Sequence, residues 1–535
     1  MKFNRRIASL LVTTLCLTSL VACSSIGTAR RGSAGLDERL DSILHRLDRG
    51  DRPLVSGRVV ELRSGRELYA ENADEPVIPA SNMKLLVTAA ALDFFGPDHA
   101  FKTYLAWDRS NNSLWVVGTG DVGIGDQPIA ARRGGDTLTV FDQWVDAIRR
   151  REGGSFASSN ATFEKLYYYD GALEEQRVHP TWAKDDLVHW YAAPVSGLNF
   201  NDNCVDITIY PTEEGKPVRY EVMPAAQDVA VVNNCVTGSK HAPEIERSQD
   251  ENVYTISGTC KEKTALKSKP VTDPGAFFAD ALRTHLKANG IEVKSIERAT
   301  RPPFGSVEPP PEMLLAVHET KLRELLPRIN KNSQNLLAEG LCKLLGRAYD
   351  HERWRPGPGS WASGSDAIHA FLDRLGIEDE AIVVADGSGL SRDNRVTTRT
   401  ISDLLVKMKS HPHADVFFDS LSVGGVDGTI RARFTDKPGV VRAKTGFIGG
   451  VRSLSGVTPS KRGPIVFSFI YNRVPGSVKP YEELQDYAVR TLMSWPELDY
   501  APPPTTQPAT QPEAQPTTRP RTRPVQPATS PIAGG

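Results

Sequence analysis

The sequence predicts an α/β (α+β) fold in which buried helices and strands are divided over more than one domain. Its 535 residues exceed the roughly 100–200 residues of one domain. Residues 82–95 are rich in Leu, Val and Ala, which is typical of a buried helix, whereas residues 113–117 and 205–210 read as strands. Hydrophobic residues make up 39% and charged residues 24%, a balance typical of a protein with a packed core.

Net charge and apolar runs exclude two broad classes of protein. Lys and Arg number 64 and Asp and Glu number 65, which leaves a formal net charge of −1. No basic excess is available to neutralise phosphates, so we expect no nucleic-acid partner. No apolar run reaches the roughly 20 residues of a spanning helix, which argues against a polytopic membrane protein.

The N-terminal segment has the features of an export signal, because positive residues precede a mostly apolar stretch at 7–22. Residues 20–23, Leu-Val-Ala-Cys, resemble the bacterial lipoprotein box, in which the cysteine is lipidated and becomes the mature N-terminus. We therefore expect a lipoprotein signal peptide at 1–22, a lipid on Cys23 and a tether at 23–35. The protein would then be exported to the periplasm or cell envelope and held on a membrane. The alternative is an ordinary secretory signal with a chance cysteine.

The first chemical motif is Ser81-x-x-Lys84, at the start of the predicted helix. A serine three residues before a lysine lies one helical turn from it, so the hydroxyl and the amine share a face. A neutral lysine in that place can take the proton of a serine that is otherwise a poor nucleophile. The chain has no other Ser-x-x-Lys, although a capped helix start is the structural alternative.

Strand-like runs separated by turns follow this helix. Residues 118–123 match the G-x-G-x-x-G pattern of a dinucleotide site, but the next residues, Ile-Gly-Asp-Gln-Pro, cannot begin the helix that such a site needs. Export would permit one disulfide among Cys204, Cys235 and Cys260, and the sequence leaves the pair open. Buried free thiols are the alternative. The cysteine spacings fit no zinc site, and we expect neither a metal nor a cofactor.

Two further motifs lie nearer the C-terminus. Ser333-x-Asn335 opens a helical pattern, whereas the other Ser-x-Asn sequences sit in polar, turn-like stretches. Lys444-Thr445-Gly446 is the only Lys-Thr-Gly in the chain and reads as part of an edge strand. After residue 498 the chain becomes rich in Pro, Thr and Gln, so we expect 499–535 to be a disordered tail.

The three motifs in this order resemble the Ser-x-x-Lys, Ser-x-Asn and Lys-Thr-Gly set of penicillin-binding proteins and serine β-lactamases. Within that group the chain is similar to the D-alanyl-D-alanine carboxypeptidase/endopeptidases of peptidase family S13, the low-molecular-mass class C branch typified by penicillin-binding protein 4. The resemblance covers about residues 36–498. It extends to the blocks at 191–198, 386–392 and 424–429.

The resemblance implies a serine β-lactamase/transpeptidase-like domain, an antiparallel sheet flanked by helices, with a large inserted mostly-β domain. Ser81 and Ser333 are 252 positions apart, far more than a compact β-lactamase needs. We expect the catalytic domain to comprise 36–100 and 307–498 and the insert to comprise 101–306.

The resemblance also implies roles for the motif residues. Ser81 would attack the carbonyl between two D-alanines, with Lys84 as base, and Ser333, Asn335 and Lys444 would relay protons and orient that base. The backbone N–H groups of Ser81 and Phe447 would hold the oxyanion.

Residues around Lys444 and in the insert would bind the substrate. Thr445 and Gly446 lie on the substrate-binding strand of the family. Phe447 departs from the Thr or Ser usual after Lys-Thr-Gly, and a hydroxyl that helps to hold the substrate carboxylate is therefore missing. Relatives that favour a diaminopimelate-type stem peptide have a side-chain pocket, whose matching positions here are Trp182, Asp185, Trp190 and Arg392. A surface turn with a structural salt bridge is the alternative.

These observations predict an exported serine-type D-Ala-D-Ala carboxypeptidase or endopeptidase, a hydrolase that acts on the peptidoglycan stem peptide. β-Lactams would inhibit it by trapping Ser81. The alternatives are a β-lactamase or esterase of the same superfamily, or a non-catalytic cell-wall-binding protein.

Overall fold

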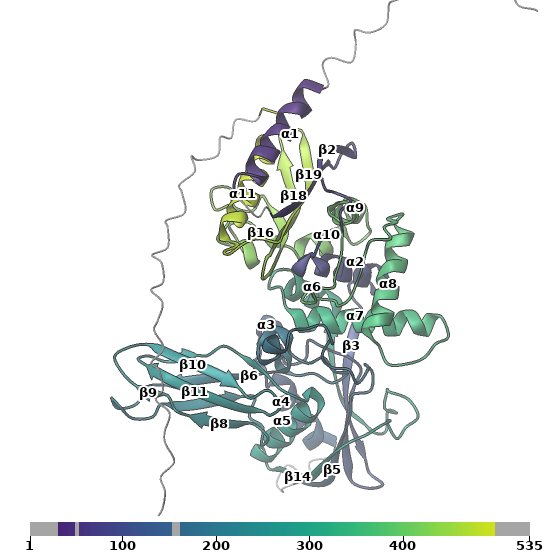
Figure 1. Ribbon diagram of the computed structural model, residues 1–535. Coiled ribbons are helices and arrows are strands. Elements are labelled where there is room, and N and C mark those ends of the chain that lie inside the picture. The colour runs from purple at the N-terminus through teal and green to yellow at the C-terminus, as the bar shows by residue number, and fades with distance from the viewer. Residues whose placement is uncertain (1–29, 49–52, 152–160, 498–535) are drawn as a thin grey trace, which may run out of the picture. The chain divides into compact units, whose positions relative to one another are not determined.

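A six-stranded antiparallel sheet lies at the centre of the part of the chain that holds the three motifs (Figure 1). The computed structural model describes residues 30–48, 53–151 and 161–497. The strand order is β16-β17-β18-β19-β1-β2, and every neighbouring pair is antiparallel. The strands are β1 (Leu54–Glu61), β2 (Arg66–Glu71), β16 (Ser422–Val423), β17 (Arg442–Ile448), β18 (Val451–Ser460) and β19 (Gly463–Asn472).

Helices cover both faces of this sheet. α1 (Arg30–Leu44) and α11 (Lys479–Ser494) pack on one face, and α9 (Thr398–Lys409) packs against β1 and β19 on the other. Alternate residues of β19 serve the two layers, since Phe467 and Phe469 join the core under α1 and α11 while Val466 and Ile470 join the opposite core. The predicted α+β class with an antiparallel sheet flanked by helices is therefore confirmed.

The helix after Ser81 is buried on all sides. α2 (Met83–Phe95) follows a 3-10 turn, η1 (Ala80–Asn82), and every residue from 83 to 92 is buried. A helix that is apolar all round needs neighbours all round. It packs against the helices α6 (Leu322–Asn330), α7 (Asn335–Glu352), α8 (Trp361–Arg374), α9 and α10 (Ala414–Asp419).

A five-stranded mixed sheet, ordered β14-β5-β4-β3-β15, begins the insert. Its strands are β3 (Ala100–Asp108), β4 (Ser113–Gly118), β5 (Ala161–Tyr169), β14 (Ile291–Arg298) and β15 (Leu314–Lys321). The helices of this region are α3 (Gln127–Arg132), α4 (Thr139–Arg151) and α5 (Pro274–Ala288). β15 lies after residue 306 and pairs with β3, so this sheet extends past the expected end of the insert.

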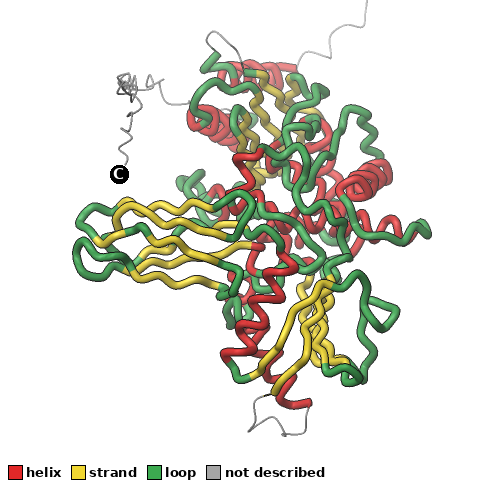
Figure 2. Tube along the Cα trace, turned by 60° about the horizontal axis from the view of Figure 1, so that its bottom comes forward, coloured by secondary structure: helices red, strands yellow, loops and turns green. Residues whose placement is uncertain are grey.

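Two small sheets complete the insert, which is mostly β as predicted. One has the order β10-β11-β8, with β9 also on β11, and appears on the left in Figures 1 and 2. The other has the order β12-β6-β13, with β7 also on β6. Their strands are β6 (Cys204–Tyr210), β7 (Arg219–Met223), β8 (Ala230–Asn233), β9 (Val236–Thr237), β10 (Ala242–Arg247), β11 (Val253–Cys260), β12 (Thr264–Ala265) and β13 (Lys269–Pro270).

Several expectations about the chain ends and cysteines meet the structure only in part. Residues 1–22, Cys23 and the tail from 499 lie outside the described residues. α1 begins at Arg30, so the end of the expected tether is helical, because Leu36 and Leu40 bury one helix face. The cysteines 204, 235, 260 and 342 are buried free thiols. Among the helices of the described ranges, none has the length and apolar character of a membrane span.

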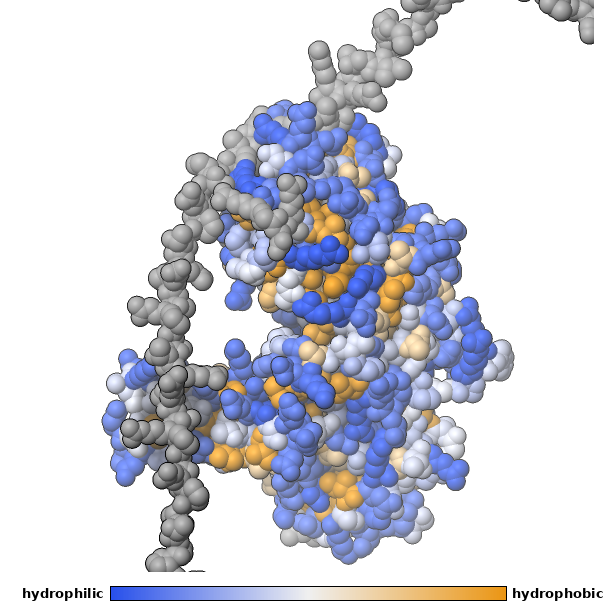
Figure 3. Space-filling model, viewed as in Figure 1, coloured by the Kyte–Doolittle hydropathy of each residue, from blue (hydrophilic) through white to orange (hydrophobic). Residues whose placement is uncertain are grey.

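The face of the molecule seen in Figure 3 is mostly hydrophilic, with separate hydrophobic areas.

Candidate active site

Ser81 and Lys84 lie together at the start of α2. Ser81 sits in the 3-10 turn η1 and Lys84 in the first turn of the helix, which sets Ser81 Oγ 3.0 Å from Lys84 Nζ. The turn is tight, since Ala80 has a φ of 49°, in the left-handed region that non-glycine residues rarely adopt. The structure thus brings this pair together as the i, i+3 spacing predicts.

Two carbonyl oxygens surround the other side of the Lys84 amine. Lys84 Nζ donates to Asn335 Oδ1 and to the backbone oxygen of Ser388, each at 2.7 Å. Asn335 is held in this orientation because its Nδ2 donates to the backbone oxygen of Tyr191 at 2.7 Å. A neutral amine has two N–H groups and one lone pair, so the two carbonyls take the N–H groups and the lone pair is left for the Ser81 hydroxyl.

Burial changes the protonation of Lys84. The side chain has no exposed surface, and desolvation lowers its pKa to about 7, although the nearby Glu339 and Asp386 oppose this effect. A pKa near neutrality is the value that suits a general base at physiological pH.

Ser333 and Lys444 form a second pair. Lys444 Nζ, on β17, donates to Ser333 Oγ at 2.9 Å and to the backbone oxygen of Thr445 at 2.8 Å. Burial, with Lys84 and Arg452 as neighbouring cations, lowers the pKa of Lys444. Of the expected catalytic residues, the structure therefore links Lys84 to both Ser81 and Asn335, and Lys444 to Ser333.

Two details of the local backbone differ from the prediction. Ser333 does not open the helix, because α7 begins at Asn335. Ser333 instead has a φ of 58°, and this left-handed conformation directs its hydroxyl toward Lys444. β17 is not an edge strand, because the two-residue strand β16 pairs with it on its outer side.

Gly446 allows β17 to approach the turn that holds Ser81. A Cβ on this residue would lie 2.1 Å from Ser453 Oγ, 2.8 Å from the oxygen of Pro79 and 3.0 Å from the backbone nitrogen of Ser81. No side chain fits there. The close approach places β17, which also holds Phe447, beside the Ser81 backbone.

A buried pair of carboxylates supports the loop that supplies the Ser388 oxygen. Glu339 of α7 accepts from the backbone N–H groups of Gly387 and Ser388, each at 2.8 Å, and from Trp361 Nε1 at 2.7 Å. Burial and the charge of Asp386 raise the pKa of Glu339 to about 7. Sequence reasoning assigned no role to either acid, since a single Glu in an apolar helix shows no pattern.

Asp202 supports the Ser-x-Asn motif from the insert. Its Oδ2 accepts from Gln334 Nε2 at 2.6 Å and from Arg328 at 3.2 Å. Arg328 also binds Asp126 at 2.7 Å. Asp202 lies in the 3-10 turn η4 (Asn201–Asn203), in which all three residues have positive φ. Such strain persists only where the surroundings enforce it, and no sequence pattern marks Asp202 as a support of the Ser-x-Asn motif.

These residues open into a cavity of about 820 Å³. On one wall of the cavity, the Thr445 hydroxyl donates to Thr429 Oγ1 at 2.8 Å. Phe447 also lines the cavity, and its side chain is 56% exposed. The lining residues are Ser81, Ala183, Asp186, Trp190, Tyr191, Ser333, Asn335, Gly389, Leu390, Arg392, Thr429, Thr445, Phe447, Ile448, Gly449 and Arg452.

The structure divides the expected side-chain pocket. Arg392 and Trp190 line the cavity, and Arg392 donates to the backbone oxygen of Gly449 at 2.6 Å. Trp182 is instead a core residue, 6% exposed, whose Nε1 donates to Asp386 at 2.9 Å. Asp185 is exposed outside the cavity wall, and its neighbour Asp186 lines the wall in its place because the 3-10 turn η2 (Lys184–Val188) points Asp186 inward.

Comparison with known proteins gives one family. The model of the D-Ala-D-Ala carboxypeptidase 3 (S13) family matches residues 36–489. The D-alanyl-D-alanine carboxypeptidase of Actinomadura sp. (strain R39) is 31% identical over 497 residues, covering 88% of this chain and 87% of the relative. The carboxypeptidase DacB of Mycolicibacterium smegmatis is 26% identical and covers 82% of this chain and 80% of its own length.

A solved structure shares the fold. The crystal structure of penicillin binding protein 4 (dacB) from Haemophilus influenzae matches with a TM-score of 0.68 at 20% identity, over 85% of this chain and all but 1% of that one. The same protein has been crystallised with a β-lactam, and that complex matches with a TM-score of 0.64.

Proposed function

This chain belongs to the D-Ala-D-Ala carboxypeptidase S13 family and is a penicillin-binding serine carboxypeptidase/endopeptidase, and we propose that its reaction proceeds through an acyl-enzyme on Ser81. The Lys84 amine is the observation that supports this proposal. When this amine is neutral, the two carbonyl oxygens accept its N–H groups and its lone pair is left for the Ser81 hydroxyl, whose Oγ lies 3.0 Å away. The substrate is the D-Ala-D-Ala end of a peptidoglycan stem peptide.

Acylation follows from this geometry. Lys84 accepts the Ser81 proton while Oγ bonds to the carbonyl carbon between the two D-alanines. The backbone N–H groups of Ser81 and Phe447 stabilise the oxyanion. The tetrahedral intermediate collapses as the C–N bond breaks, and Ser333, hydrogen-bonded to Lys444, gives a proton to the departing amine. Ser333 regains a proton by relay from the protonated Lys84, which returns that amine to its neutral form. Water then hydrolyses the ester, which frees Ser81.

Phe447 has no hydroxyl to bind the terminal carboxylate of the substrate. Arg452 can bind this carboxylate instead. Arg452 lies directly opposite Phe447 in the β17–β18 register and lines the cavity. Its guanidinium binds Glu482, yet its buried Nε has no hydrogen-bond partner in the described chain. An arginine is the side chain best shaped for a carboxylate.

The protein works on cell-wall peptidoglycan, outside the cytoplasm. We propose, from the sequence at 1–23, that it is exported with a lipoprotein signal peptide and attached to a membrane through a lipid on Cys23. In cells that make the protein, Cys23→Ser should move it from the membrane fraction to the soluble fraction, and unchanged fractionation would contradict the anchor.

Release of D-alanine tests the proposed function. The wild-type protein should release D-alanine from a peptide ending in D-Ala-D-Ala, and Ser81→Ala should release none. Cleavage of a cross-linked dimer in the same assay reports endopeptidase activity. Rapid turnover of a penicillin without D-alanine release would favour the β-lactamase or esterase alternative, and no reaction with either substrate would favour a non-catalytic wall-binding protein.

A further inference from the structure

A second cavity adjoins the active-site cavity on the side of the insert. It measures about 750 Å³, and Trp190 and Tyr191 line both cavities. Trp190 is 38% exposed, so part of its ring is accessible to a ligand. The walls come from η2, η3 (Trp190–Ala192), β10 and the chain before β13, and they include Val188, His189, Pro243, Glu244, Ile245, Glu246, Arg247, Gln249, Leu266, Lys267, Ser268 and Lys269.

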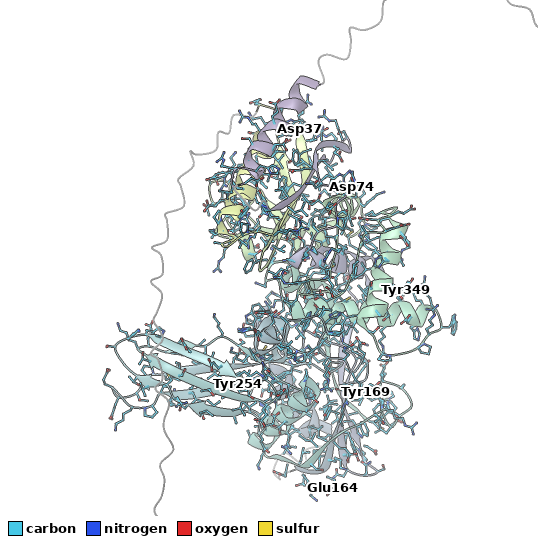
Figure 4. The ribbon with its side chains drawn as sticks, viewed as in Figure 1. Asp37, Asp74, Glu164, Tyr169, Tyr254 and Tyr349 are labelled. Carbon is cyan, nitrogen blue, oxygen red and sulfur yellow. The ribbon has the colours of Figure 1, made fainter. Side chains whose placement is uncertain are left out.

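Lys269 is a cationic residue in this wall. It is 6% exposed, and within the described ranges its amine makes no hydrogen bond or ion pair. Its strand is fixed on both sides, because β13 pairs with β6 and the Tyr254 hydroxyl donates to the backbone oxygen of Pro270 at 3.1 Å (Figure 4 labels Tyr254). Burial lowers the pKa of Lys269, and the nearby Glu246 carboxylate opposes this effect.

Arg247 adds a second incompletely bonded cation. Its guanidinium donates to the backbone oxygen of Leu187 at 3.2 Å, but its buried Nε has no partner in the described chain. The acids of the wall, Glu244 and Glu246, are both exposed, and Glu246 acts on the charge of Lys269. The three cations of the wall, Lys267, Lys269 and Arg247, outnumber its two acids, and the cavity thus suits an anion.

We infer that this second cavity is a substrate subsite that binds a carboxylate-bearing stretch of the peptidoglycan stem peptide while the D-Ala-D-Ala end of the same substrate lies at Ser81. The inference rests on the proposed function for the identity of the substrate. Lys269 Nζ and Arg247 Nε bind the carboxylate, and Trp190 packs against the chain that passes from one cavity to the other.

Peptide binding to the Ser81→Ala protein tests the subsite without turnover. The probes are two peptides that end in D-Ala-D-Ala and are extended at the N-terminal side, one with free side-chain carboxylates and one with the matching amides. We expect the carboxylate peptide to bind about tenfold more tightly, since a hydrogen bond to a charged group is worth at least that factor. Equal dissociation constants for the two peptides would overturn the inference. Both peptides are measured on the same protein, so the comparison requires no substitution among the residues of the cavity.

Variants then locate the effect. Lys269→Met should remove the preference for the carboxylate peptide and leave binding of the amide peptide unchanged, whereas Lys261→Met, at an exposed lysine outside the wall, should keep the preference. Loss of the preference in both variants, or in neither, would contradict the role of Lys269. Penicillin acylation of Lys269→Met with Ser81 intact should match wild type, which shows that the protein is folded. If the wild-type protein releases no D-alanine but the peptide preference is observed, the proposed function is contradicted and the subsite is not.

Discussion

Lys84 is the residue on which the proposed chemistry depends most. It gains a useful basicity because the fold removes its water, while two carbonyl oxygens fix the direction of its lone pair toward Ser81. An exposed lysine at the same spacing would stay protonated at neutral pH and could not take a proton.

The rate of acylation should therefore depend on pH through Lys84. Burial lowers its pKa to about 7, so the amine is protonated and inactive below that value and neutral above it. We expect the rate constant for acylation by a penicillin to rise about tenfold per pH unit below pH 7 and to level off above it. Rates measured between pH 5 and 9, with folding followed by circular dichroism, check this. A rate that is flat or falls through this range would contradict Lys84 as the base.

Glu339 should act on stability and activity together. In Glu339→Gln the amide cannot accept all three hydrogen bonds from Gly387, Ser388 and Trp361. A buried donor left unpaired costs about 1–3 kcal/mol in the free energy of unfolding. The Ser388 carbonyl should also shift away from Lys84, which slows acylation. Urea unfolding and penicillin kinetics measure both effects, and Glu352→Gln, at the exposed end of the same helix, should change neither.

Arg452 should set the affinity for the substrate carboxylate. Arg452→Gln is expected to raise KM for a D-Ala-D-Ala peptide about tenfold, because a charge-assisted hydrogen bond is lost. The exposed Arg462 on the same hairpin serves as the control. Steady-state kinetics with peptides ending in an acid or an amide give the answer, and a variant that still prefers the acid would show that the carboxylate lies elsewhere.

Site residues that form a local pattern could be predicted from the sequence, whereas those joined only by tertiary contacts could not. Ser81 and Lys84 stand one helical turn apart, so their contact follows from spacing alone. The pair of Ser333 and Lys444 lies on two distant segments, and only the family resemblance joined them. Asp186 replaces Asp185 on the cavity wall because the phase of a short 3-10 turn cannot be read from composition.

Among the elements, the distance between β17 and the turn η1 determines where the backbone of β17 lies relative to Ser81. Gly446→Ala would set a methyl group 2.8 Å from the oxygen of Pro79 and 3.0 Å from the nitrogen of Ser81, so the strand must move away. We expect penicillin acylation to slow by at least about tenfold, as removal of an oxyanion-hole donor does. Gly357→Ala, where a methyl group meets nothing within 4 Å, is the matched control. Equal acylation rates in the two variants would show that the close approach is not needed.

Element type was largely predictable, and the exact position of each element was not. The apolar stretch at 82–95 is a helix as its composition indicates, and the runs at 113–117 and 205–210 are strands. β16 escaped prediction because two residues show no periodicity, and β17 consequently lies one strand in from the edge. The left-handed Ser333 is set by its tertiary contacts rather than by local preference.

For the whole molecule, the insert is joined to the catalytic residues by specific contacts. Tyr191 and Asp202 of the insert bind Asn335 and Gln334 of the Ser-x-Asn motif. The inserted segment is therefore part of the site that surrounds Ser81. The sequence indicated the size of the insert but none of these contacts, which depend on how separate elements pack.

Ser81 should form the acyl-enzyme. Intact-protein mass spectrometry after incubation with a penicillin tests this role most directly. The wild-type protein should gain one penicillin mass, which peptide mapping places on Ser81, while Ser81→Ala should keep its mass. No adduct on the wild type, or an equal adduct on Ser81→Ala, would contradict the account.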